Sequence, residues 1–219
     1  MAKKKQTTAL VLRCCAPDMS SKGGFVWPGA GEEAVAPDWK DDGNCDHGLH
    51  GWLYGQGNHG CSDYWSNSGA KWLVVEVELS SVVMLGGKVK FPRGTVRFVG
   101  ERHEAAAYLI AHEPQAAGVA VIGASLSVGD EQAVHVGALG TATAGDGGAA
   151  TAGDGGTATA GYRGTATAGD RGELRIRWYD YKADRYRLAI AYVGEDGIEP
   201  NVAYRLDDEH KFVRAATPD

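Results

Sequence analysis

The feature that most constrains this chain is a repeat of eight residues between positions 141 and 172. Written in register, the repeat reads TATAGDGG, AATAGDGG, TATAGYRG and TATAGDRG. The same frame continues more loosely backward through residues 133–137 and 125–129, and forward into residues 173–178. A fixed short period sets the architecture of the segment that carries it. Residues 117–180 therefore organise the interpretation of the whole chain.

Each repeat combines a strand signal with a turn signal. Four residues alternate between alanine and a polar residue, which is typical of a strand, and the following Gly-Asp-Gly-Gly is typical of a turn. We expect such arcs to stack into a narrow β-solenoid, in which each coil depends on its neighbours, with the glycines at positive-φ corners. The alternative is a disordered low-complexity linker, and the strict register argues against it.

Alternation also assigns a direction to each side chain of the repeat, because successive strand residues point to opposite faces. The alanines would point inward, where only methyl groups fit, and the threonines would point outward in rows. We predict an interaction surface made of the outward threonines and one tyrosine. Its members are Thr141, Thr143, Thr151, Thr157, Thr159, Tyr162, Thr165 and Thr167.

Residues 160–167, AGYRGTAT, resemble the AGYGSTxT repeat of bacterial ice-nucleation proteins. The resemblance covers residues 144–172, and only Tyr162 matches the tyrosine position, which is aspartate in Asp146, Asp154 and Asp170. It implies that two octapeptides form one coil, that Thr-x-Thr rows organise water and that stacked tyrosines promote self-association. One matching tyrosine in so short an array argues against ice nucleation. The resemblance carries over a flat β-solenoid with threonine rows.

The recurring aspartates of the repeat allow a second interpretation. Calcium-binding β-rolls also place aspartates in glycine-rich turns, but they follow a nine-residue rule. The period of eight and the tyrosine at position 162 favour aspartates that bond turn amides instead.

Charge and hydropathy exclude several functional classes. The formal net charge of −6 argues against a nucleic-acid-binding protein, which is usually basic. No apolar run is long enough to predict a membrane span. After the basic start at residues 1–6, the apolar run covers only residues 9–12, which is too short for a signal peptide. We therefore predict a protein of the bacterial cytoplasm, in which the four cysteines are free thiols.

The rest of the chain predicts a mostly β protein with three parts. Residues 1–116 form a small α+β head, with strands at 7–16, 71–78, 81–85, 87–91 and 95–99 and a helix at 102–112. Residues 117–180 form the octapeptide β-solenoid. Residues 181–219 form a C-terminal β cap, in which strands at 185–193 and 202–206 pair as a hairpin and cover the open end of the stack.

The head also resembles known sequences. A strand that ends in Arg-Cys, the segment CDHGLHG at residues 45–51 and the strand WLVVEV resemble uncharacterised proteins of phages and mobile elements. That resemblance implies a genomic setting and no chemistry. The strand, loop and Gly-Leu-His order is also similar to the ADP-ribosyltransferase-like fold, which would imply a nucleotide held by Arg13 and His50.

Cysteine and histidine cluster within residues 45–61. Both residue types bind zinc, and the metal candidates are Cys45, His47, His59 and Cys61. Their Cys-x-His and His-x-Cys spacings differ from the usual zinc patterns, so loop histidines that bond backbone carbonyls are the main interpretation. Zinc stays an alternative, and no other cofactor is predicted.

His50 is the strongest single candidate for a ligand-binding residue, because the glycines around it let a ligand approach the backbone. The further candidates are Arg13, His47, Trp52, Tyr54 and Trp65, of which the aromatic ones would serve as stacking surfaces. The alternative is that these side chains only build core and turns. Spacing identifies no general acid–base pair, so no catalytic residue is predicted.

These observations favour a non-enzymatic binding protein of a phage or mobile element. Its solenoid would serve self-association or partner docking, so a homo-oligomer and a protein partner are expected. One alternative is an enzyme or a sequestering protein for a small nucleotide, of ADP-ribosyltransferase-like shape, that acts through Arg13 and His50. An inhibitor of host defence would fit either function. Another is a threonine array that binds water or ice.

Overall fold

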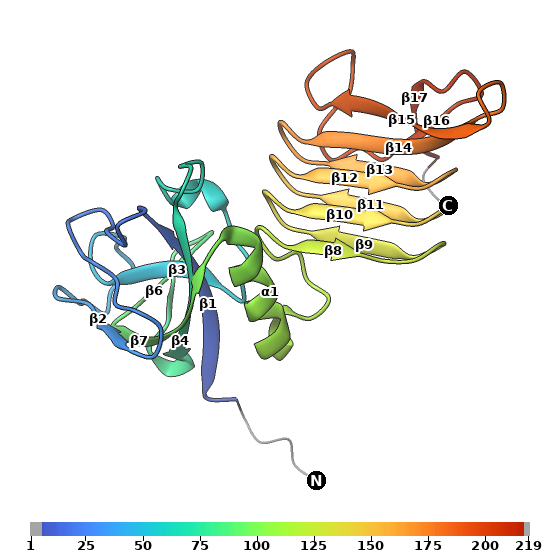
Figure 1. Ribbon diagram of the computed structural model, residues 1–219. Coiled ribbons are helices and arrows are strands. Elements are labelled where there is room, and N and C mark those ends of the chain that lie inside the picture. The colour runs from blue at the N-terminus through green and yellow to red at the C-terminus, as the bar shows by residue number, and fades with distance from the viewer. Residues whose placement is uncertain (1–5, 217–219) are drawn as a thin grey trace, which may run out of the picture. The chain divides into compact units, whose positions relative to one another are not determined.

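The computed structural model describes residues 6–216, and the basic start used to predict the location of the protein lies mostly outside them. The chain is mostly β and divides between Ala117 and Gly118 into two compact units. Figure 1 shows a sheet with one α-helix in the first unit and a stack of short strands in the second. Within the described residues, no helix is long and apolar enough to cross a membrane.

The first unit is built on one antiparallel sheet. Its strand order is β2-β7-β4-β1-β3-β6-β5 within the described chain. The strands are β1 (Thr8–Cys15), β2 (Glu33–Val35), β3 (Leu49–Leu53), β4 (Lys71–Glu78), β5 (Val83–Met84), β6 (Val89–Phe91) and β7 (Arg93–Gly100). β1 and β4 pair along their whole length because both are apolar runs with almost every side chain buried. The strands predicted for the head are confirmed, with small shifts at their ends.

Helix α1 (Arg102–His112) is confirmed with the predicted bounds. A capping box between Glu101 and Glu104 satisfies amides at its start. Its buried residues are Ala105, Ala106 and Leu109, and the helix packs on β1, β4 and β7. Directly after the helix, the buried Glu113 accepts a hydrogen bond from the backbone N–H of Leu10 at 2.9 Å. This bond joins the end of α1 to the central strand.

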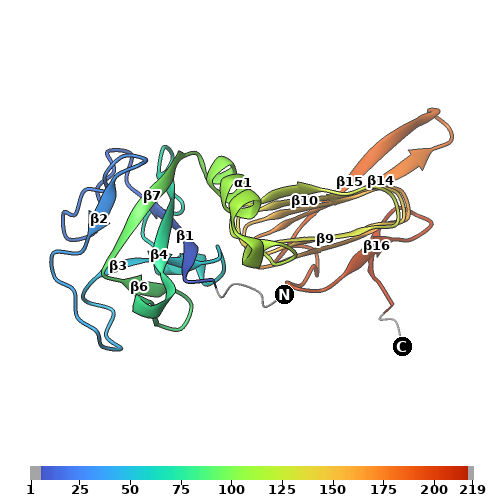
Figure 2. The same ribbon diagram turned by 90° about the horizontal axis from the view of Figure 1, so that it is seen from below.

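The second unit contains the predicted β-solenoid, which makes about three coils in residues 125–176. Strands β8 (Ser125–Ser127), β10 (Thr141–Ala144), β12 (Thr157–Ala160) and β14 (Glu173–Asp180) form one parallel sheet. Strands β9 (Ala133–Val136), β11 (Ala149–Ala152) and β13 (Thr165–Ala168) form the other. Each strand pairs with the strand sixteen residues away, as in Thr141 with Thr157, so two octapeptides make one coil. Figure 2 shows the two sheets facing each other across a narrow interior.

Methyl groups fill that interior, as predicted. The inward alanines are 0–3% exposed; they are Ala142, Ala144, Ala150, Ala152, Ala158, Ala160, Ala166 and Ala168. Leu174 and Ile176 continue the same buried rows into β14. In the middle coils alanine fills the space between the sheets, and larger apolar side chains occupy the same rows in the end strands, with Val134 and Val136 in β9.

The glycines of the repeat have a different role from the one predicted. The positive-φ corner holds glycine only at Gly147 and Gly155, whereas Arg163 and Arg171 occupy it in the later repeats with φ of 59° and 55°. The remaining repeat glycines lie where one coil touches the next. A Cβ on Gly161 would lie 2.5 Å from the backbone nitrogen of Asp146. Close approach between coils, and not turn geometry, therefore requires most of these glycines.

The C-terminal strands close the stack, but the predicted pairing between them is wrong. β15 (Arg185–Tyr192) pairs antiparallel with β14, and β16 (Tyr204–Leu206) pairs with β13 and with β17 (Phe212–Arg214). The segment at residues 194–201 thus crosses from one sheet to the other and is not a hairpin turn. The reason is the length of β14, which runs for eight residues and offers β15 a partner beyond the solenoid rung.

Candidate functional site

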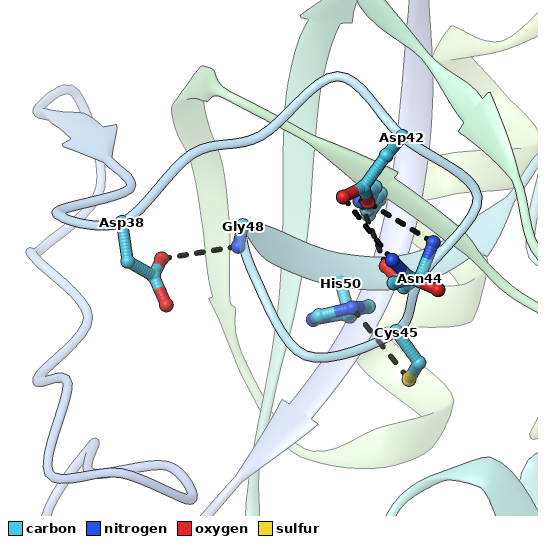
Figure 3. Close-up of polar contacts among 7 residues, drawn as sticks. Asp38, Asp42, Asn44, Cys45, Gly48 and His50 are labelled. Atoms are coloured by element: carbon cyan, nitrogen blue, oxygen red, sulfur yellow. Dashed lines mark hydrogen bonds and ion pairs between the residues drawn. The ribbon is translucent and has the colours of Figure 1, made fainter.

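The loop before β3 in the first unit is fixed by a buried lysine. Lys90, on β6, is 0% exposed, and its Nζ lies 2.7 Å from Asp42 Oδ1 and 2.7 Å from the Asn44 carbonyl oxygen. The hydrogen bond from Lys90 lowers the pKa of Asp42 to about 2. Asp38 accepts a hydrogen bond from the Gly48 amide at 3.0 Å (Figure 3). These bonds hold the loop beside His50. The only sequence signal for them was a lysine inside the apolar run of residues 89–91.

A cleft of about 440 Å³ opens between this loop and the segments that face it. We call it the head cleft. Its walls include Arg13 from β1, Trp27 and Tyr64 from loops, His50 from β3 and Lys88 from the turn before β6. Segments distant in sequence therefore meet at one place, and a pocket of this size suits a small organic molecule.

Arg13 is the central charged group of the head cleft. One guanidinium nitrogen donates a hydrogen bond to the His50 carbonyl oxygen at 2.8 Å. The guanidinium carbon lies 5.0 Å from the centroid of the Trp27 ring, within the range of a cation–π contact. The Nε of Arg13 and the Nε1 of Trp27 are buried and have no hydrogen-bond partner among the described residues. Burial lowers the pKa of Arg13, although an arginine side chain remains charged.

His50 is neutral near pH 7 in this environment. Burial, reinforced by the positive charges of Lys88 and Arg13, lowers its pKa to about 4. Its Nε2 lies 3.9 Å from the sulfur of Cys45 (Figure 3). The His50 ring therefore offers hydrogen bonding to the head cleft and no charge.

The structure brings some of the predicted ligand-binding residues together and separates the others. Arg13 and His50 line the head cleft, and Trp52 lines a smaller pocket that shares these two residues with it. Trp52 is a core residue that stacks on Trp72, and its Nε1 donates to the Asn58 carbonyl oxygen at 2.9 Å.

His47, Tyr54 and Trp65 are not among the residues that line the head cleft. Trp65 packs edge-on against His59, with 4.8 Å between the ring centroids. Tyr54 occupies a turn position with a φ of 56°. The Nδ1 of His47 is buried and finds no hydrogen-bond partner among residues 6–216.

The metal candidates do not assemble. Within residues 6–216, no group of three or more His, Cys, Asp or Glu side chains is arranged to hold a metal ion. Cys45 and Cys61 line the head cleft, and His59 lies against Trp65 instead. All four cysteines are free thiols, and burial raises the pKa of Cys15 to about 11, which leaves that thiol protonated.

The second candidate site is the outward face of the sheet that holds β8, β10 and β12. Its six hydroxyl residues, which we call the threonine face, are Ser125, Ser127, Thr141, Thr143, Thr157 and Thr159. The register places Thr143 directly between Ser127 and Thr159. At the C-terminal end, Glu173 and Arg175 on β14 continue the rows as an ion pair with 2.9 Å contacts.

The opposite face is less regular. Its outward positions hold Ala133 and His135 on β9, then Ala149 and Thr151 on β11, and only β13 carries two threonines, Thr165 and Thr167. Tyr162, the last residue of the predicted interaction surface, lies in a turn, where the guanidinium carbon of Arg163 is 5.1 Å from its ring centroid.

The repeat aspartates connect one coil to the next. Asp146 accepts a hydrogen bond from the backbone N–H of Tyr162 at 2.8 Å, and Asp154 accepts one from the N–H of Asp170 at 3.0 Å. Asp130 accepts in the same way from the N–H of Asp146. Each donor lies sixteen residues after its acceptor, so the prediction that the repeat aspartates bond turn amides is confirmed for Asp146 and Asp154.

Comparison with known proteins gives two similarities. Residues 9–111 match a family described as a domain of unknown function, DUF7666. The chain is also 38% identical over 107 residues to an ice nucleation protein of Xanthomonas campestris pv. translucens, which covers 48% of this chain and 7% of that protein. An ice nucleation protein of Pseudomonas syringae is 35% identical over 107 residues, or 48% of this chain and 9% of that protein. Ice nucleation protein InaU of Pantoea ananas is 32% identical over 110 residues, or 49% of this chain and 10% of that protein.

This chain therefore spans a tenth or less of the length of these relatives. No solved structure matches it. The similarity agrees with the predicted resemblance of the octapeptides to ice-nucleation repeats. The resemblance of the head to phage proteins stays a prediction.

The predicted cytoplasmic location is wrong. The relatives found by comparison are ice nucleation proteins of bacteria, and this finding contradicts the predicted location. The prediction depended on the short apolar run at residues 9–12, and the structure places that run in the central strand β1. The run therefore belongs to the core of the first unit and carries no information about the location of the protein.

Proposed function

We propose that the threonine face of the solenoid binds and orders water, and through that layer binds ice. The observation that carries the proposal is the register of its hydroxyls. Ser125, Thr141 and Thr157 form one row across the strands, and a second row runs parallel to it two residues further along each strand. Neighbouring strands lie about 4.8 Å apart, and alternate residues of a parallel strand lie about 6.6 Å apart. The result is a regular two-dimensional array of hydroxyl and methyl groups.

Two properties of the threonine face suit it to ordered water. The branched β-carbon of threonine restricts the side chain to few rotamers, so the threonine hydroxyl positions are fixed before water binds. The backbone N–H and C=O groups of a middle strand such as β10 bond to β8 and β12 and do not compete for that water. The names of the relatives support ice as the solid that the face would bind. With only three strands in the array, we expect binding to existing ice and not nucleation.

The test compares charged substitutions on the two faces of the solenoid. In the first variant, Thr143 and Thr159 are replaced by lysine, which places long charged side chains over the threonine face. In the matched control, Thr151 and Thr167 on the opposite face are replaced by lysine. Thermal hysteresis and partition into a growing ice hemisphere are measured for both variants and for the wild type, and circular dichroism checks that each variant is folded.

We expect the wild type and the control to bind ice and the Thr143→Lys, Thr159→Lys variant to lose most of that binding. A wild-type protein without thermal hysteresis and without partition into ice would refute the proposal. Equal loss in both variants would show that the threonine face is not the specific site.

A second candidate function, self-association, is favoured by the edge strand β15. This strand is the last in its sheet, and its outward side chains Tyr186, Leu188, Ile190 and Tyr192 are each about half exposed. An unpaired edge with apolar side chains is a template for pairing with another strand. We propose antiparallel pairing of β15 with β15 of a second copy, because identical edges make a closed two-fold contact.

Solution mass at micromolar concentration tests this pairing. We expect the wild type to be a dimer and the Leu188→Lys, Ile190→Lys variant to be a monomer. Val35→Lys is the matched control, because Val35 is also an exposed apolar residue on the edge strand of a sheet, β2. A monomeric wild type, or dissociation by the control alone, would contradict the proposal.

A further inference from the structure

The head cleft contains a positive charge, on Arg13, that no carboxylate of the described residues neutralises. Within residues 6–216, none of the ion pairs involves Arg13. A charge withdrawn from water is costly unless an opposite charge or several hydrogen bonds compensate it. The guanidinium has one hydrogen bond, to the His50 carbonyl oxygen, and its contact with the Trp27 ring. Arg13 is therefore incompletely satisfied in the protein alone.

Two buried N–H donors indicate the chemical nature of the missing partner. In the described part of the chain, Arg13 Nε and Trp27 Nε1 both lack an acceptor, and their side chains are in contact at the wall of the same cleft. Buried donors are almost always hydrogen-bonded, so two orphaned donors beside one cleft are a specific feature. Carboxylate and phosphate oxygens are the acceptors that arginine binds most strongly.

We propose that the head cleft binds a small planar molecule through a single oxyanion group, which accepts hydrogen bonds from Arg13 Nε and Trp27 Nε1. Lys88, which is half-buried at the cleft wall, adds positive charge on the same side. The proposal concerns the first unit alone and does not depend on water binding by the threonine face.

The side chains that line the cleft indicate the chemistry of the part of the ligand that is not the oxyanion. Phe25 packs edge-on against Trp27, with ring centroids 5.4 Å apart, and Tyr64 also lines the cleft. Aromatic walls favour a flat apolar ligand that stacks on them. His50 is neutral near pH 7, so it can hydrogen-bond a polar substituent of that body.

The rim of the cleft limits the charge of the ligand. Asp38, Asp46 and Asp63 line it and are exposed. Three carboxylates near the opening repel a molecule with several negative charges, such as a nucleoside triphosphate. The partly buried Arg13 guanidinium beside the orphaned Trp27 Nε1, inside an acidic rim, selects a ligand with one anionic group.

Titration calorimetry with four probes tests the proposal and identifies the anion. Benzoate supplies a carboxylate on a flat ring, phenyl phosphate supplies a phosphate on the same ring, inorganic phosphate supplies the anion alone, and benzamide is the neutral analogue of benzoate. We expect at least one of the two aromatic anions to bind at millimolar concentration, more tightly than inorganic phosphate or benzamide. The stronger of the two shows whether carboxylate or phosphate is preferred.

Two substitutions connect binding to the named donors. Arg13→Met removes the charge and keeps a side chain of similar length. We expect it to weaken binding of the aromatic anion by about tenfold or more. Trp27→Phe keeps an aromatic ring and removes only the N–H, and we expect a loss of a few-fold. The matched control is Arg93→Met, which removes an exposed arginine that pairs with Glu33 on the same unit.

Three outcomes would overturn the proposal. They are no binding of either aromatic anion to the folded wild type, equal affinity for benzamide and benzoate, and unchanged anion affinity in folded Arg13→Met. If Arg13→Met does not fold, the Trp27→Phe variant decides, because unchanged affinity there contradicts a role for the indole N–H.

Discussion

The carboxylate of Asp146 accepts a hydrogen bond from the backbone N–H of Tyr162, which lies sixteen residues later and one coil higher. The same carboxylate oxygen lies 2.6 Å from a guanidinium nitrogen of Arg177 on β14. One side chain thus connects three consecutive levels of the stack. Each coil of a solenoid is stabilised mainly by its neighbours, so such connections determine whether the levels open together or singly.

We expect Asp146→Ala to loosen the stack locally. The lost hydrogen bonds should lower the free energy of local opening by roughly 1 kcal/mol, a modest value because the carboxylate is more than a third exposed to solvent. Hydrogen exchange of the Tyr162 amide measures this directly. Asp208→Ala, at an exposed position, is the control. Unchanged protection of Tyr162 in Asp146→Ala would show that the bond does not stabilise the coil.

The alanine interior predicts an asymmetry between two adjacent residues. Ala158 is 0% exposed between the two sheets, and its neighbour Thr159 points outward. Ala158→Val adds two methyl groups to a filled space and should cost about 1–3 kcal/mol of unfolding free energy. Thr159→Val changes an outward side chain and should stay within about 0.5 kcal/mol. Hydrogen exchange of the β12 amides under increasing denaturant measures the unfolding free energy of each variant. Similar losses in Ala158→Val and Thr159→Val would mean that the interior can expand.

The stability lost when a repeat glycine is substituted should depend on contact between coils and not on the φ angle of that glycine. Gly161→Ala places a Cβ 2.5 Å from the backbone nitrogen of Asp146, so it should displace one coil from the next and lower the melting temperature of the second unit. Gly147→Arg should be tolerated although its φ is +69°, because arginine already occupies the equivalent corner at Arg163 and Arg171. Melting curves of the two variants provide the comparison. A larger loss in Gly147→Arg would reverse this ranking.

His50 should make the first unit sensitive to mildly acidic conditions. Its pKa is lowered from an ordinary value of 6.5 to about 4, so between these values the unfolded chain binds more protons than the folded one. Stability then rises with pH across that window and is lost as the pH falls through it. We expect the urea midpoint of the wild type to fall more between pH 7 and pH 5 than that of His50→Gln. Equal pH dependence of both proteins would show that His50 titrates normally.

Much of the structure of the second unit can be predicted from the sequence. Every eight residues repeat the same strand length and the same alternation of inward and outward side chains. Ala158 and Thr159 receive opposite environments from alternation alone. The role of Gly161 does not follow, because it depends on the coil beside it, which a pattern along one strand does not describe. The partners of β15 and β16 were also beyond the sequence, since both are alternating strands and only the extended length of β14 decides between them.

The head cleft was less predictable for a similar reason. Arg13 and His50 were identified as candidates from their local sequence, and they do line one cleft. Trp27 and Lys90 were not among the predicted site residues. Their roles arise from distant segments: Trp27 meets Arg13 on β1, and Lys90 meets the loop at residues 42–44. No local periodicity reports such encounters.

The sixteen-residue register also fixes the unit in which this gene segment can grow or shrink. Strands alternate between the two sheets, and the hydrogen bonds of Asp146 and Asp154 both run to a partner sixteen residues away. Duplication of one octapeptide would move β14 and every later strand to the other sheet and reverse the side on which each closing strand lies. Duplication of two octapeptides keeps every later strand in place and adds one rung to each row of hydroxyls. Lineages of such proteins should therefore differ in length by whole coils, and the extent of the threonine face should change in the same steps.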